Sequence, residues 1–169
     1  ALAEAGDTAG ARRWLREASR VTDFAARDFA LARLGDLEAS ARDTAAAASA
    51  WETLTRLDPP ALRADRGRVF LAAAALKSGR PEAAVELAQA ALGGGIKGED
   101  AAQANLAIAR AQFRLDRAQA GREACLRVMG EAPGSLAARA AWRLLAGRAA
   151  AAGLALTVDE RLAAGTVLL

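Results

Sequence analysis

Leu31-Ala32-Arg33-Leu34-Gly35 is followed along the chain by Ala47, Trp51, Leu54 and Asp58-Pro59. In this stretch a large residue and a Leu-Gly pair precede a short polar segment, and a small residue, an aromatic residue and a proline follow it. Large and small residues in this order suit two helices that pack closely against each other. A proline in the last place ends one hairpin and starts the next. The stretch therefore predicts a helical hairpin over residues 23–57.

Small residues recur along the chain at the place that Ala47 holds in this hairpin. Ala11, Ala47, Ala84 and Gly121 are separated by 36, 37 and 37 residues. A constant spacing of this length is the sequence signature of stacked helical units. One hairpin cannot cover its own apolar face, so we expect the units to stabilise one another by stacking, with Ala47, Ala84 and Gly121 at helix contacts.

Capping residues and prolines mark the start of the expected helices. They are Asp7, Asp43, Asp58 with Pro59-Pro60, Pro81, Asp116, Ser135, and the pair Thr157 and Glu160. The helices are expected near 7–20, 23–37, 43–57, 60–78, 80–92, 99–114, 116–131, 135–152 and 157–169. The predicted fold is all-α, one segment over 1–169 with a partial hairpin at 1–20 and hairpins at 23–57, 60–92, 99–131 and 135–169.

The stretch from Leu31 to Pro59 resembles a tetratricopeptide repeat in its Leu-Gly pair, small residue, aromatic residue and closing proline. The resemblance implies a right-handed superhelical solenoid of antiparallel helix hairpins, in which the first helices line a concave groove. The chain departs from the family pattern at Glu38, where the family usually has an aromatic residue. Its unit is also about three residues longer than the family's usual 34.

The groove that this resemblance implies mixes arginine with phenylalanine. Its expected residues are Arg33, Arg66, Phe70, Lys77, Arg110, Phe113, Arg114 and Arg143. Arginine and aromatic residues are enriched at binding surfaces, and arginine pairs well with carboxylates. We therefore expect an acidic or C-terminal peptide, gripped by Arg110 and Arg114 beside the rings of Phe70 and Phe113. The sequence leaves open the alternative that these arginines are simply solvated surface residues.

The composition argues against several kinds of chemistry. The chain has no histidine, and Cys125 is its single cysteine. These counts exclude a Cys/His nucleophile, a Ser/His/Asp triad and a Cys/His zinc site. The run Gly93-Gly94-Gly95-Ile96-Lys97-Gly98 lacks the Lys-Ser/Thr pair of a phosphate loop, so we interpret it as a connector. We expect Cys125 to be an inert core residue, and we expect no catalytic residue, metal or cofactor.

Charge and hydropathy narrow the choice of partner. The chain has 23 basic and 20 acidic residues, and this excess of +3 does not demand a nucleic acid. The residues expected to line the groove also lack a repeated set of polar side chains that could read the bases of a nucleic acid. No apolar run reaches the 18 residues of a membrane-spanning helix. The expected partner is a protein or peptide, and self-association through the ends of the repeat stays open.

The end of the chain suggests a second function. Ala132-Pro133-Gly134-Ser135 and Val158-Asp159-Glu160-Arg161-Leu162 are similar to parts of the repeat regions of periplasmic soluble lytic transglycosylases. This resemblance implies the non-catalytic superhelical region of a larger cell-envelope enzyme, whose chemistry would lie outside this segment. The first hypothesis remains a bacterial interaction scaffold that is not itself an enzyme. The compartment is left open between periplasm and cytoplasm, with the periplasm favoured.

Overall fold

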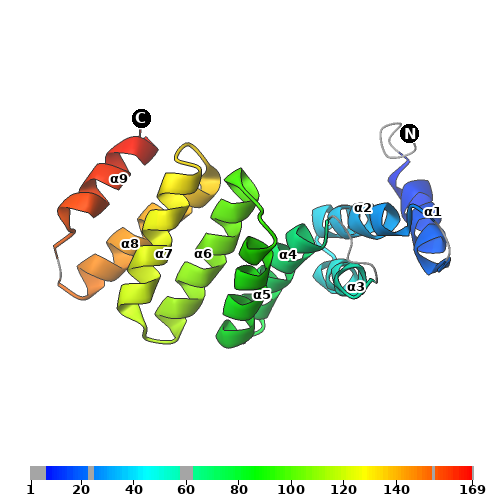
Figure 1. Cartoon of the computed structure of the whole chain (residues 1–169), viewed down its shortest axis with the longest axis horizontal. Coiled ribbons are helices and arrows are strands. Elements are labelled where there is room, and N and C mark those ends of the chain that lie inside the picture. Colours follow the sequence, from blue (N-terminus) through cyan, green and yellow to red (C-terminus); the bar gives the residue numbers. More distant parts are fainter. Residues whose placement is uncertain (1–6, 23–24, 58–62, 154, 169) are drawn as a thin grey trace. The chain divides into compact units, whose positions relative to one another are not determined.

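The computed structural model describes residues 7–22, 25–57, 63–153 and 155–168, and all regular secondary structure in these ranges is helical (Figure 1). The helices are α1 (Thr8–Arg20), α2 (Arg27–Ser40), α3 (Thr44–Thr55), α4 (Ala64–Lys77), α5 (Pro81–Gly93), α6 (Gly98–Arg114), α7 (Ala118–Glu131), α8 (Leu136–Ala151) and α9 (Val158–Leu168). The all-α prediction is confirmed for these ranges, and each expected helix is present. The expected helix start at Asp58 to Pro60 lies outside the described residues. Within the described ranges, no helix has the length and hydropathy needed to cross a bilayer.

Side-chain caps fix several helix starts. Asp7 accepts a hydrogen bond from the Gly10 N–H at 2.7 Å, and Asp43 accepts one from the Ala46 N–H at 3.0 Å. Ser135 Oγ accepts from the Ala138 N–H at 3.0 Å in the same way. Each bond satisfies a backbone donor that has no partner inside its helix. These three predicted helix starts are confirmed.

Four of the six described residues with left-handed backbone recur at intervals of 37 residues, whereas the other two, Gly95 and Gly98, lie between α5 and the start of α6 and are outside this period. The four are Arg42 (φ 62°), Gly79 (φ 72°), Asp116 (φ 56°) and Gly153 (φ 63°), and each stands shortly after the end of a helix. A residue in this conformation commonly terminates a helix. The predicted helix start at Asp116 is therefore wrong, because Asp116 forms the turn and α7 begins at Ala118.

The hydrogen bonds of these turns repeat as well. The N–H that follows the left-handed residue donates to the carbonyl five residues earlier, from Asp43 to Glu38, from Arg80 to Ala75 and from Arg117 to Gln112, at 2.9 Å each time. This bond is the mark of a Schellman motif. The 37-residue period is thus present in the backbone itself, and the fold is compatible with a helical repeat.

The chain forms two compact units, Ala1–Leu71 and Ala72–Leu169, which we call the N-terminal unit and the C-terminal unit. In the N-terminal unit, a core of Leu15, Ala30, Leu34 and Ala50 joins α1, α2 and α3. Trp51 of α3 is 2% exposed and lies against two glycines. A methyl group on Gly35 or Gly67 would come within 2.5 or 2.8 Å of its indole ring.

The C-terminal unit is organised around α6, which packs against α5, α7 and α8. Figure 1 shows α6 and α7 side by side, joined by a short turn. At the α6–α7 contact, a methyl group on Gly121 would lie 2.9 Å from the Phe113 ring. Ala84 of α5 and Ala47 of α3 are fully buried. The expected burial of the small residues at the repeat positions is therefore confirmed for Ala47, Ala84 and Gly121.

Candidate partner-binding surfaces

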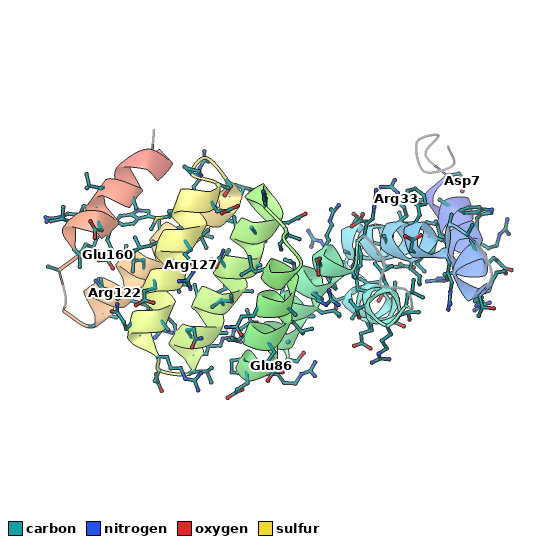
Figure 2. All side chains as sticks on the ribbon, in the orientation of Figure 1. Asp7, Arg33, Glu86, Arg122, Arg127 and Glu160 are labelled. Atoms are coloured by element: carbon teal, nitrogen blue, oxygen red, sulfur yellow. The ribbon has the colours of Figure 1, made fainter. Side chains whose placement is uncertain are left out.

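Three of the expected groove residues lie in the N-terminal unit. Arg33 projects from α2 and is exposed (Figure 2). Arg66 is also exposed, with Nη2 3.6 Å from Oδ1 of Asp36. Phe70 is half-buried, and its ring centroid lies 6.4 Å from that of Trp51. Arg33 and Arg66 are thus available at the surface, whereas Phe70 is partly used in packing.

The other five lie in the C-terminal unit, where the structure separates them by role. Lys77, Arg110 and Arg143 are exposed. Phe113 is 6% exposed and packs on Gly121, with the guanidinium of Arg148 5.4 Å from its ring centroid. It is therefore a core residue, and the expectation that its ring forms a shelf beside a ligand is wrong.

Arg114 has a structural partner of its own. Its Nη1 donates a hydrogen bond to the backbone carbonyl of Leu76, in the last turn of α4. The same carbonyl also accepts from the Gly79 N–H at 3.2 Å, and a cation at this end of a helix interacts favourably with the negative end of the helix dipole. Arg110 and Arg114 therefore do not form the free pair expected from their spacing, because Arg114 would have to leave Leu76 to grip a ligand together with Arg110.

The N-terminal unit also contains a cleft that the sequence pattern did not indicate. It has a volume of about 400 Å³ and lies among α1, α2 and α3. Its lining residues, which define what we call the arginine cleft, are Arg16, Ser19, Arg20, Arg27, Leu31, Leu34, Glu38, Ala46, Ser49, Ala50 and Thr53.

The arginine cleft is on a different face of α2 from the expected groove. Arg27, Leu31, Leu34 and Glu38 follow one another at intervals of three or four residues, so they share one face of the helix. At 100° per residue, Arg33 stands roughly opposite this face. The two surfaces are thus separate, and a ligand in the arginine cleft would not contact Arg33.

A buried carboxylate anchors the arginines of α1. Glu38 is 1% exposed, and its Oε1 accepts a hydrogen bond from Arg16 Nη2 at 2.8 Å. Its other oxygen, Oε2, lies 3.0 Å from Nε of Arg12. Burying a carboxylate is unfavourable unless it is paired and hydrogen-bonded, and both oxygens of Glu38 have an arginine beside them. Glu38, which departs from the tetratricopeptide pattern, therefore joins α2 to α1 through two guanidinium groups.

The two remaining arginines of the cleft, Arg20 and Arg27, form fewer hydrogen bonds and ion pairs than Arg16. Arg27 Nε donates to the Ser19 carbonyl at 2.9 Å, and its terminal nitrogens form no hydrogen bond or ion pair with a described residue. The Arg20 side chain is exposed and forms no hydrogen bond or ion pair with any described residue. The cleft therefore presents guanidinium groups whose hydrogen-bonding capacity is only partly used by the fold.

In the C-terminal unit, an ion pair connects α7 to α9. Arg122 on α7 and Glu160 on α9 lie next to each other (Figure 2), with Arg122 Nη2 2.6 Å from Glu160 Oε2. The same Glu160 oxygen accepts from the Thr157 N–H at 2.7 Å, and the Glu160 N–H donates back to Thr157 Oγ1 at 3.3 Å. This reciprocal pair is the predicted capping box. Glu160 thus caps α9 and ties it to α7.

Cys125 lies close to this ion pair and is fully buried, as expected for a core residue. Burial raises the pKa of its thiol from 9.0 to about 12, with a further increase from the charge of Glu160 and an opposing effect of Arg110. Since the thiolate is the reactive form, Cys125 is unreactive at neutral pH.

The sequence matches no model of a known protein family, and no curated protein or solved structure matches it either.

Proposed function

We propose that this chain is a tetratricopeptide-like helical repeat that binds a segment of another protein and performs no chemistry of its own. The repeat is supported by the four left-handed turns at a 37-residue period and by the equivalent hydrogen bonds in three of them. Buried small residues at Ala47, Ala84 and Gly121 follow the same period. Stacked hairpins of this type present long rows of helix surface, which suits them to protein binding.

One observation carries the binding role. All six cations of the expected groove are exposed, and four of them form no hydrogen bond or ion pair with any described residue. These four are Arg33, Lys77, Arg110 and Arg143. Arginine is among the residues that contribute most to protein interfaces, since its planar guanidinium can bind a carboxylate through two hydrogen bonds. These exposed cations, one in the N-terminal unit and three in the C-terminal unit, are therefore suited to contacts with an acidic partner.

Site-specific photo-crosslinking in the cells from which the gene comes tests the proposal. A photoreactive residue is placed at Arg33 or Arg143, and a matched control carries it at the exposed Glu82 of α5. We expect a protein that crosslinks at the arginine positions and not at Glu82. This protein should bind the purified chain, about tenfold more weakly when Arg33 or Arg143 is replaced by alanine. Identical crosslinks at all three positions would contradict the proposal.

A further inference from the structure

We infer that the arginine cleft of α1, α2 and α3 binds the carboxylate side chains of an acidic peptide segment, with Arg20 and Arg27 as its direct contacts. The inference rests on the proposed function in one respect, namely that the ligand belongs to another protein. The site differs from the expected groove, because it uses the opposite face of α2 and arginines of α1.

The charge of the arginine cleft favours an anionic ligand. Its lining contains three arginines and one glutamate, a net charge of +2 at neutral pH. The carboxylate of Glu38 is already shared between Arg16 and Arg12. Neither Arg20 nor the terminal nitrogens of Arg27 have a carboxylate partner among the described residues. A ligand carboxylate would supply a counter-charge that the described residues do not provide.

The fixed position of the Arg16 side chain reduces the entropy that is lost when a peptide binds in the arginine cleft. Its guanidinium is held by Glu38 at 2.8 Å, so one wall of the cleft is ordered before a ligand arrives. Arg27 is held in a similar way through the bond from Nε to the Ser19 carbonyl. A side chain that is already fixed loses less conformational entropy when it contacts a ligand. Glu38 therefore orders the part of the cleft formed by Arg16, whereas the Ser19 carbonyl holds Arg27.

The remaining lining residues favour a peptide over a simple anion. Leu31, Leu34 and Ala50 give the cleft an apolar floor, which suits the aliphatic part of a peptide side chain. At the rim, Thr53 Oγ1 donates its proton to the Ser49 carbonyl and keeps its lone pairs for a peptide N–H. The volume of about 400 Å³ is within the range of small-ligand pockets.

Calorimetry with a defined pair of peptides tests this inference. The probe is an acetylated and amidated hexapeptide of alternating leucine and glutamate, and its matched control has glutamine in place of each glutamate. Both are titrated into the purified full chain at low salt, where attraction between charges is least screened. We expect the glutamate peptide to bind at least about tenfold more tightly than the glutamine peptide.

Arg20→Ala is the principal variant, because Arg20 makes no bond in the described fold whose loss would disturb folding. We expect it to weaken binding of the glutamate peptide about tenfold, and Arg27→Ala to do the same. Arg56→Ala is the matched control, since Arg56 is an exposed arginine of the same unit outside the cleft. It should bind the peptide like the wild type. Circular dichroism confirms that each variant is folded.

The outcomes separate this inference from the proposed function. If Arg20→Ala and Arg27→Ala bind normally while Arg33→Ala does not, the arginine cleft is not the site and the groove remains. Equal binding of the two peptides would exclude carboxylate recognition. Inorganic phosphate that binds as tightly as the glutamate peptide would show a simple anion site and overturn the inference. Absence of peptide binding would also overturn it, whereas the proposed function would still depend on the crosslinking result.

Discussion

Trp51 and Gly35 are so close that no side chain on the glycine would fit between them. A methyl group at Gly35 would lie 2.5 Å from Cε2 and 2.6 Å from Nε1 of the indole, and Trp51 is nearly completely buried. The indole N–H finds no hydrogen-bond acceptor among the described residues, so packing alone holds the ring. The absence of a side chain at Gly35 lets α2 pack directly on the indole of α3.

Replacing Gly35 with alanine should therefore destabilise the protein. The new methyl group would force the indole or the α2 backbone to move, and overpacking of this kind costs about 1–3 kcal/mol. Gly147→Ala is the matched control, since Gly147 is an exposed glycine inside α8, where a new methyl group would have no described atom outside its own helix backbone within 4 Å. Alanine there should stabilise the helix by about 0.5–1 kcal/mol. Urea unfolding measures both, and equal effects would contradict the close contact.

Arg42→Gly should stabilise the chain. Arg42 adopts a φ of 62°, a backbone conformation that costs a residue with a Cβ atom about 1–2 kcal/mol. Glycine removes this cost but increases the entropy of the unfolded chain, so we expect a net gain of about 0.5–1 kcal/mol. The reverse change, Gly79→Ala, should destabilise by a similar amount. A lower melting temperature for Arg42→Gly would show that its side chain stabilises the turn in another way.

Arg114→Ala tests whether this arginine supports the fold. It removes the hydrogen bond to the Leu76 carbonyl, so we expect a loss of about 1 kcal/mol in the free energy of unfolding. Arg139→Ala serves as the control, because Arg139 is exposed on α8 and forms no bond with another described side chain. It should change stability by less than about 0.5 kcal/mol. If the two variants are equally stable, the bond to Leu76 contributes nothing.

Cys125 should make stability depend on pH at alkaline values. Its pKa is raised from 9.0 to about 12 in the fold, so below pH 9.0 the thiol is protonated in both states and the stability is fully present. Between pH 9.0 and about 12 only the unfolded thiol ionises, and stability falls by about 1.4 kcal/mol per pH unit. From pH 8 to 10, wild type should lose about 1.4 kcal/mol more than Cys125→Ala. Parallel pH profiles in urea unfolding would contradict this expectation.

The helices could be predicted from the sequence because their signals are local. Asp7, Asp43 and Ser135 act through a backbone N–H only three residues away, so the cap and its partner are visible in one short segment. Burial of Ala47 and Ala84 was predictable from a different signal, the recurrence of a small residue after 37 residues, which is typical of a close helix contact. Asp116 misled the prediction because aspartate is common both in caps and in left-handed turns.

The candidate site was harder to predict, because it depends on which helix faces meet. Arg12, Arg16 and Arg20 follow at four-residue intervals, which places them on one side of α1. That spacing was a usable signal for a row of arginines. It did not indicate the partner in α2, because Glu38 is 22 residues away from Arg16 and its burial depends on the packing of the two helices. Phe113 shows the same limit, since an apolar side chain suits a core and a groove equally.

Four of the left-handed turns recur at a fixed interval of 37 residues. Arg42, Gly79, Asp116 and Gly153 adopt one backbone geometry with three different residue types, so the position in the chain matters more than the side chain. A deletion from one of these residues to the next removes 37 residues, and a duplication adds 37. In both cases a helix end is still followed by a left-handed residue at the same distance. We therefore expect a chain that gains or loses 37 residues between two of these turns to tolerate the change better than one cut inside a helix.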